Sequence, residues 1–176
     1  MLKEIIEKSR VPKITLEEKT IDGIYVEAEV CERTRKTIKQ FAKSIGIDSD
    51  FDDYHSTVIY SKKEVPESEL IKIRQTYPEN ISIYGFATGY KKFINKEQDI
   101  YAIVLEVKCP KLEELHKQLM ERFDLIYDYD EYIVHITLTY KGKDIDIEDL
   151  PEPDFEVRYT KLNVEPLNTD WAKDAE

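Results

Sequence analysis

The sequence predicts an α+β domain of two lobes, a duplicated strand–helix–strand fold with antiparallel sheets around a central cleft. Two observations lead to this fold class. Segments in which apolar and polar residues alternate indicate half-buried strands, and segments with apolar residues every three or four positions indicate helices between them. The same order of elements then returns in the second half, where Cys109 takes the place of Cys31. We expect the 176 residues to form a single domain, 1–176.

The first repeat is expected at about residues 23–62. GIYVEAEV alternates as a half-buried strand should, with Ile24 and Val26 on its apolar face. Apolar residues recur at helical spacing at Ile38, Phe41, Ala42 and Ile45, and Gly46 then ends the predicted helix. YHSTVIYS then reads as the partner strand. Residues 1–20 are expected to be an N-terminal extension, in which an apolar pattern at residues 2–6 could form one or two helical turns.

The second repeat is expected at about residues 101–142. YAIVLEVK indicates a strand, PKLEELHKQLMERF a helix that starts with a proline, and YIVHITLTY the partner strand. Between the repeats we expect a helix with Pro66 in its first turn, a strand in NISIYGFATGY, and a charged loop near residues 91–99 that could overhang a site. FEVRYTKLNVEPL alternates as a last strand.

Composition limits the class of protein. No apolar run approaches the roughly 20 residues that span a bilayer, and MLKEIIEKSR lacks the apolar stretch of a signal peptide. We therefore expect a soluble, cytoplasmic chain without a membrane partner. The net charge of −11 argues against a protein that binds long nucleic acid through its phosphates, although local donors in a pocket could still hold a small anion. Cys31 and Cys109 lie in no metal-spaced pair, and we expect both to be free.

Two of the three histidines begin the same short motif, His-x-Thr followed by an apolar residue. The motifs are His55-Ser56-Thr57-Val58 and His135-Ile136-Thr137-Leu138. Residues two apart on a strand point to the same face, so each histidine should have its threonine beside it. A single such motif is weak, but one copy in the equivalent place of each repeat predicts that both pairs meet at one site.

Two histidines beside a phosphodiester can cleave it without a metal ion. One takes a proton from the attacking hydroxyl and the other gives a proton to the departing oxygen, while the threonine hydroxyls stabilise the growing charge. We therefore predict His55, Thr57, His135 and Thr137 as catalytic residues, with no metal and no cofactor. A zinc site is disfavoured because neither motif has a second ligand nearby. His116, beside Leu115 on a predicted helix, is expected to be solvated.

These motifs and their spacing resemble the 2H phosphoesterase superfamily, whose members carry two such motifs in a duplicated α+β fold. Within it, IDGIYVEAEV and DDYHSTVIYSKK resemble the bacteriophage anti-CBASS nucleases, which destroy the cyclic oligonucleotide signals of a bacterial defence system. The resemblance covers about residues 20–62 and 130–172. It implies metal-independent cleavage of cyclic di- and trinucleotides such as 3′,3′-cGAMP. A phage-encoded chain would act in the cytoplasm of the infected host.

The resemblance also implies three substrate-binding residues. Tyr25 matches the family's base-stacking aromatic residue, and Glu165 and Trp171 match its C-terminal glutamate and tryptophan. Each has an alternative: Tyr25 could pack a sheet edge, Glu165 could be solvated, and Trp171 could pin the tail to the body. Lys62, Lys63 and Lys141 follow the motif strands and could meet phosphates, or be solvated.

The hypothesis from sequence is that one histidine, provisionally His55, deprotonates a ribose 2′-hydroxyl, and that His135 protonates the leaving 5′ oxygen. The repeat makes the histidines nearly equivalent, so the sequence leaves this assignment open. It also leaves base and ring-size preference and the oligomeric state open. Two alternatives remain: an RNA-processing enzyme that opens 2′,3′-cyclic phosphates, and a sponge that binds the cyclic nucleotide without cleaving it.

Overall fold

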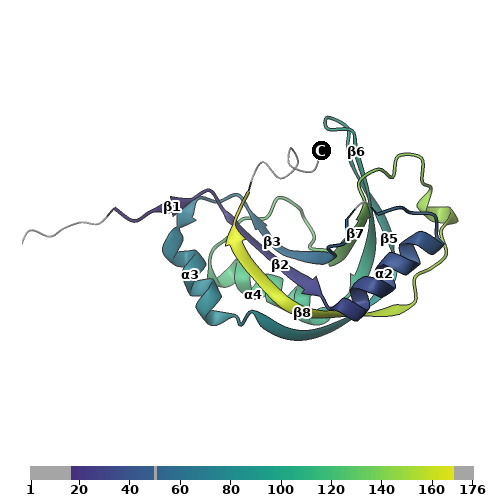
Figure 1. Cartoon of the computed structure of the whole chain (residues 1–176). Helices are drawn as coiled ribbons and strands as arrows, with labels where there is room; N and C mark the ends of the chain where they lie inside the picture. Colours follow the sequence, from purple (N-terminus) through teal and green to yellow (C-terminus); the bar gives the residue numbers. More distant parts are fainter. Residues whose placement is uncertain (1–16, 50, 169–176) are drawn as a thin grey trace, which may run out of the picture.

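The computed structural model describes residues 17–49 and 51–168 (Figure 1). The predicted turns at residues 2–6 and Trp171 lie outside these ranges. The helices and strands, in chain order, are β1 (Thr20–Ile21), β2 (Ile24–Val30), α2 (Glu32–Ser44), β3 (His55–Ser61), β4 (Val65–Pro66), α3 (Glu67–Thr76), β5 (Asn80–Asn95), β6 (Ile100–Lys108), α4 (Pro110–Arg122), β7 (His135–Thr139), the 3₁₀ turn η1 (Ile147–Asp149) and β8 (Phe155–Pro166).

The main sheet has six antiparallel strands in the order β3-β2-β8-β5-β6-β7. Each half of this order contains one strand–helix–strand unit, β2-α2-β3 in the first and β6-α4-β7 in the second. The long strands β8 and β5 pair with each other at the junction of the halves. The α+β fold class and its duplicated strand–helix–strand order are therefore confirmed.

The two motif strands, β3 and β7, are the outer strands of this order, yet they lie next to each other. The sheet curls strongly, as Figure 1 shows, and brings its two edges together. The hydroxyl of Ser56 on β3 donates a hydrogen bond to the backbone carbonyl of His135 on β7, with an oxygen–oxygen distance of 2.8 Å. Curling thus gives the backbone carbonyl of His135, on the edge strand β7, a hydrogen-bond partner from the opposite edge.

The helices pack against this sheet through apolar faces that the sequence already shows. Ile38 and Ala42 of α2 and Leu112 and Leu119 of α4 are buried. Both cysteines stand immediately before a helix, at the N-caps of α2 and α4, and both are free, as predicted. Gly46 follows α2 with a left-handed φ of 80°, which suits a residue without a Cβ and stops the helix.

One predicted loop is a strand instead. We expected residues 91–99 to form a charged loop, but β5 continues through Asn95 in register with β6, and only a short turn remains before Ile100. The expectation was wrong because pairing with β6 stabilises this charged segment as a strand. We expected Pro66 in the first turn of a helix, but it is the N-cap residue of α3, immediately before the helix begins at Glu67.

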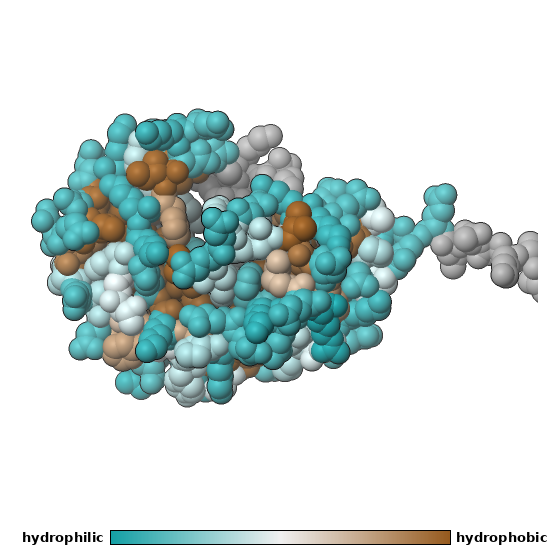
Figure 2. All heavy atoms as spheres, turned by 180° about the vertical axis from the view of Figure 1, so that it is seen from behind, coloured by the Kyte–Doolittle hydropathy of each residue, from teal (hydrophilic) through white to brown (hydrophobic). Residues whose placement is uncertain are grey.

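The surface is mainly hydrophilic, with apolar side chains in small groups between charged ones, as the face in Figure 2 shows. This agrees with the 36% of charged residues. Among the described residues, no helix is both long enough and apolar enough to cross a membrane.

Candidate active site

The four motif residues begin two strands that touch. His55 and Thr57 lie at the start of β3, and His135 and Thr137 lie at the start of β7. All four side chains are half-buried. Burial lowers the pKa of His135 below its ordinary value, and the neighbouring His55 lowers it further. The structure thus brings the two motifs together, as the sequence led us to expect.

Both motif strands contain a β-bulge immediately after the threonine. Glu27 pairs with Thr57 whereas Val26 pairs with Ile59, so Val58 is an extra residue in β3. In β7 the pairing skips Leu138 in the same way. Both extra residues are fully buried, so the apolar residue that ends each motif anchors its strand in the core. Bulges of this kind re-aim side chains near functional sites.

His116 supports the bulge in β3 and is not solvated as predicted. It is 9% exposed, and its Nδ1–H donates to the carbonyl of Val58 at 2.7 Å. Its ring stacks on Tyr132 with centroids 3.9 Å apart, and the Tyr132 hydroxyl donates to the carbonyl of Thr57 at 2.8 Å. The prediction failed because these contacts come from distant segments of the chain. Burial lowers the pKa of His116.

A compact polar group surrounds His55. The Tyr25 hydroxyl donates to Glu27 Oε2 at 2.8 Å and also lies 3.1 Å from His55 Nε2 and 3.3 Å from Thr57 Oγ1. Glu27 Oε2 lies 3.4 Å from the same histidine nitrogen. Asn163 on β8 donates to the other oxygen of Glu27 at 3.1 Å and fixes that carboxylate. Burial, followed by the charge of Glu27, raises the pKa of Tyr25 far above its ordinary value.

His135 has different surroundings. Its Nδ1–H donates to the backbone carbonyl of Ile133 at 2.7 Å. In the neutral ring, Nε2 is then the nitrogen without a hydrogen. The ring of Phe93, from the end of β5 that we had predicted as a loop, meets the imidazole edge to face with centroids 5.2 Å apart. Phe93 itself is 40% exposed, so this end of β5 lies at the surface beside the histidine.

The structure places two of the three predicted substrate-binding residues. Tyr25 on β2 pairs directly with Glu165 on β8, so both side chains lie on one face of the sheet. Glu165 is exposed, whereas Tyr25 is half-buried and its hydroxyl points into the group around His55. Lys62 and Lys63, which we had considered as phosphate contacts, form ion pairs with Asp128 and Asp124.

Sequence reasoning missed two neighbours of the histidines. Glu27 stands two residues after Tyr25 on the polar face of its strand, and this alternation could have identified it. Phe93 could not have been found, because its segment lacked a clear strand pattern.

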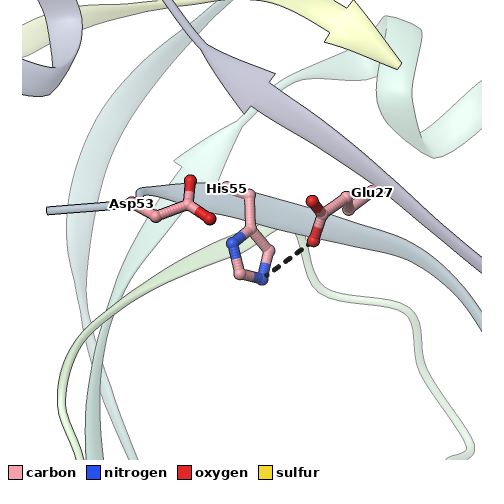
Figure 3. Close-up of side chains that lie close together, drawn as sticks. All are labelled: Glu27, Asp53 and His55. Atoms are coloured by element: carbon pink, nitrogen blue, oxygen red, sulfur yellow. Dashed lines mark ion pairs between the residues drawn. The ribbon is translucent and has the colours of Figure 1, made fainter. Parts of the chain in front are cut away.

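Glu27, Asp53 and His55 could together hold a metal ion (Figure 3). Each offers one ligand atom, and these atoms lie within 4.8 Å of one another. Asp53 is exposed, however, and exposed carboxylates often lie this close without a cation. Glu27 already accepts two hydrogen bonds from protein groups, and His135 does not belong to the cluster. We therefore assign no metal role to these residues.

Comparison with solved structures shows the fold. A phosphoesterase has a TM-score of 0.55 and 13% identity, and the match covers 82% of this chain and 87% of that one. Escherichia coli LigT with 3′-AMP has a TM-score of 0.51 and 13% identity, with 84% and 96% covered. LigT with NADP⁺ has a TM-score of 0.54 and 14% identity, with 82% and 86% covered. The search of curated proteins gives no match.

A match between the sequence and a family model shows to which family the chain belongs. The family model described as anti-CBASS protein Acb1 matches residues 22–174, which is most of the chain. This range includes both histidine motifs and all three predicted substrate-binding residues. The resemblance to anti-CBASS proteins with a phosphoesterase fold is thereby confirmed, and the chain belongs to the Acb1 family of anti-CBASS proteins.

Proposed function

We propose that this anti-CBASS protein is a metal-independent phosphodiesterase that cleaves the 3′-5′ linkages of cyclic oligonucleotide signals such as 3′,3′-cGAMP. A phage would thereby evade the bacterial defence, acting in the host cytoplasm. The observation that carries the proposal is the pair of His-x-Thr motifs, held against each other by the bond between Ser56 and the carbonyl of His135. Family membership supports the cyclic oligonucleotide as the substrate class.

The chemistry follows from this arrangement. One imidazole removes the proton of a ribose 2′-hydroxyl, whose oxygen then attacks the adjacent phosphorus. The bond from phosphorus to the 5′ oxygen breaks, and the other imidazole protonates that oxygen as it leaves. Thr57 and Thr137 donate hydrogen bonds to the nonbridging oxygens, where charge grows. The product is a linear oligonucleotide with a 2′,3′-cyclic phosphate.

The neighbouring strands supply a place for a base. Tyr25 and Glu165 lie side by side on the sheet face that carries His55, because their strands pair in register. We propose that the ring of Tyr25 stacks on a base and that the exposed carboxylate of Glu165 accepts hydrogen bonds from its edge. Trp171, outside the described residues, is proposed as a further base contact.

The test is chromatography of 3′,3′-cGAMP after incubation with the protein in EDTA. Linear products from the wild type, and none from a His55→Ala, His135→Ala double variant, would support two-histidine cleavage. Thr57→Ala should lower the rate, whereas Thr76→Ala, an exposed threonine on α3, should not.

Other outcomes would redirect the proposal. Intact ligand recovered after denaturation of a tight complex would favour a sponge. Absence of both binding and cleavage would remove this substrate, and RNA ends with 2′,3′-cyclic phosphates would be tried next. A 2′-deoxy analogue that is cut as fast as the ribose substrate would contradict attack by the 2′-hydroxyl.

A further inference from the structure

The two histidines occupy equivalent places in the repeat but have unequal neighbours. The residue paired with Thr57 on the adjacent strand is Glu27, whereas the residue paired with Thr137 is Val104. The first site therefore has a carboxylate where the second has a fully buried aliphatic side chain. An acid and a base must start in opposite protonation states, so this difference bears on which histidine has which role.

The protons around Tyr25 can be assigned from its contacts. Its hydroxyl carries one proton, and burial raises the pKa of Tyr25, so that proton is retained at neutral pH. The hydroxyl donates the proton to Glu27 Oε2, because a carboxylate only accepts. The tyrosine oxygen can then only accept from His55 Nε2, 3.1 Å away. Nε2 of His55 must therefore carry a hydrogen, which Glu27 at 3.4 Å also attracts.

The same reasoning gives the opposite result for His135. The carbonyl of Ile133 only accepts, so the hydrogen of His135 lies on Nδ1. Burial and the neighbouring His55 lower the pKa of His135, which favours its neutral form. Its Nε2 accepts no hydrogen bond from the described residues, so it offers a lone pair to the substrate. One ring presents a hydrogen at Nε2 and the other presents an acceptor there.

We propose that His135 is the general base and His55 the general acid of this cleavage, with Glu27 and Tyr25 as positioning residues that hold the hydrogen of His55 on Nε2. The assignment rests on the proposed function and reverses the provisional one drawn from sequence. It needs no metal or cofactor group beyond these side chains.

The proton balance of the step is complete. His135 Nε2 takes the 2′-hydroxyl proton and becomes an imidazolium, while the 2′ oxygen forms its bond to phosphorus. The leaving 5′ oxygen keeps the electron pair of the broken bond and receives the Nε2 proton of a doubly protonated His55. In that form the Nδ1–H of His55 faces the carboxylate of Asp53, which lies on that side of the ring in Figure 3.

The ionisable groups that face the two rings agree with these roles. Tyr25, Glu27 and Asp53 surround His55, and Glu29 is its partner in the strand pairing. Buried Nδ1 of His55 has no hydrogen-bond partner within the described ranges, so it can take up the second proton. Glu106 is the strand partner of His135 but forms no ion pair with it in the described part of the chain.

A substrate with a sulfur leaving group distinguishes the general acid from the general base. In a 3′,3′-cyclic dinucleotide whose bridging 5′ oxygens are replaced by sulfur, the departing thiolate needs no proton. We expect His55→Ala to lose about 10²–10⁴-fold on the oxygen substrate but less than about 10-fold on the sulfur substrate. His135→Ala should lose activity on both. If the sulfur substrate restores the activity of His135→Ala alone, or of neither variant, the assignment is overturned.

Glu27→Gln tests the positioning role, and Glu156→Gln, at an exposed glutamate on β8, is its matched control. The new amide would offer a hydrogen to Tyr25, so the tyrosine hydroxyl could turn toward His55 and displace the Nε2 hydrogen. We expect a loss of roughly 10-fold or more on the oxygen substrate and little on the sulfur substrate. Glu156, whose strand partner is Phe86 on β5, should on replacement leave both rates within about 3-fold. Equal losses on both substrates would mean a merely structural role for Glu27.

A measurement without substrate separates this inference from the proposed function. Long-range ¹H–¹⁵N spectra of the histidines near pH 9, about 2.5 units above an ordinary histidine pKa, report which nitrogen holds the hydrogen. We expect Nε2–H for His55 and Nδ1–H for His135 and His116, with single-histidine variants giving the assignments. Nδ1–H at His55 would refute the inference, even if cleavage occurs. Failure of the wild type to cut either substrate would instead refute the proposed function.

Discussion

Replacing Ser56 by alanine tests the connection between the two motif strands. The Ser56 hydroxyl is fully buried, donates to the carbonyl of His135, and lies 2.6 Å from the hydroxyl of Tyr159. Since the serine proton goes to the carbonyl, the tyrosine donates to the serine oxygen. Ser56→Ala therefore removes one bond between β3 and β7 and leaves a buried tyrosine hydroxyl without its acceptor.

The expected loss is about 2–4 kcal/mol in the free energy of unfolding. A lost hydrogen bond contributes about 0.5–1.5 kcal/mol, and an unsatisfied buried donor costs about 1–3 kcal/mol. The assay is urea unfolding followed by circular dichroism, with Ser44→Ala, an exposed serine on α2, as the control. In a domain of this size the melting temperature should fall by about 2–4 °C per kcal/mol.

A double-mutant cycle with Tyr159→Phe makes this reasoning refutable. Once the tyrosine hydroxyl is absent, Ser56→Ala no longer leaves an unsatisfied donor, so the double variant should lose less than the sum of the two single losses. We expect a coupling of at least about 1 kcal/mol, since the two groups touch. A loss below about 0.5 kcal/mol for Ser56→Ala, or strict additivity, would refute the reasoning.

Three further results are expected. Gly85→Ala should cost about 1–3 kcal/mol in urea unfolding, because the added Cβ would lie 2.7 Å from Val107 Cγ1, whereas Gly89→Ala meets nothing within 4 Å and should be neutral. The free energy of unfolding should decrease as the pH falls from 7 to 5. Burial lowers the pKa of His116, so over this range the unfolded chain binds a proton that the folded chain excludes. In thermal melts, the stability of His116→Phe should decrease less over the same pH range. Raising salt from about 10 to 150 mM should increase kcat/KM, since a protein of net charge −11 repels an anionic substrate and salt screens that repulsion; a decrease would indicate a basic binding surface instead.

Much of the fold could be predicted because its signals are local. Alternation along the segments of β2 and β8 identified half-buried strands, and Gly46 marked the end of a helix. The end of β5 was missed because strand pairing with β6, and not its own charged sequence, makes it a strand. Local pattern therefore indicates where elements form, but not how far tertiary pairing extends them.

The candidate site, like the fold, was predictable only where its signals are local in the sequence. The repeated motif identified all four residues that the structure brings together on β3 and β7. The supporting contacts of His116 were not visible, because Val58 and Tyr132 reach it only through the packing of α4 against β3. Glu27 was visible as a polar-face residue, but its contact with His55 depends on the register between β2 and β3.

Duplication explains how two histidines reach equivalent places, but equivalence alone cannot give them different tasks. The difference must come from side chains that the repeat does not share. Two residues before His135, Ile133 offers a backbone carbonyl to Nδ1; two residues before His55, Asp53 places a carboxylate on the Nδ1 side of the ring. On the neighbouring strands, Glu27 faces one motif and Val104 the other. These two departures from symmetry act in the same direction, because Asp53 and Glu27 place a carboxylate near each nitrogen of the His55 ring and can accept its hydrogens, whereas the Ile133 carbonyl accepts only from Nδ1 of His135 and Val104 offers no acceptor.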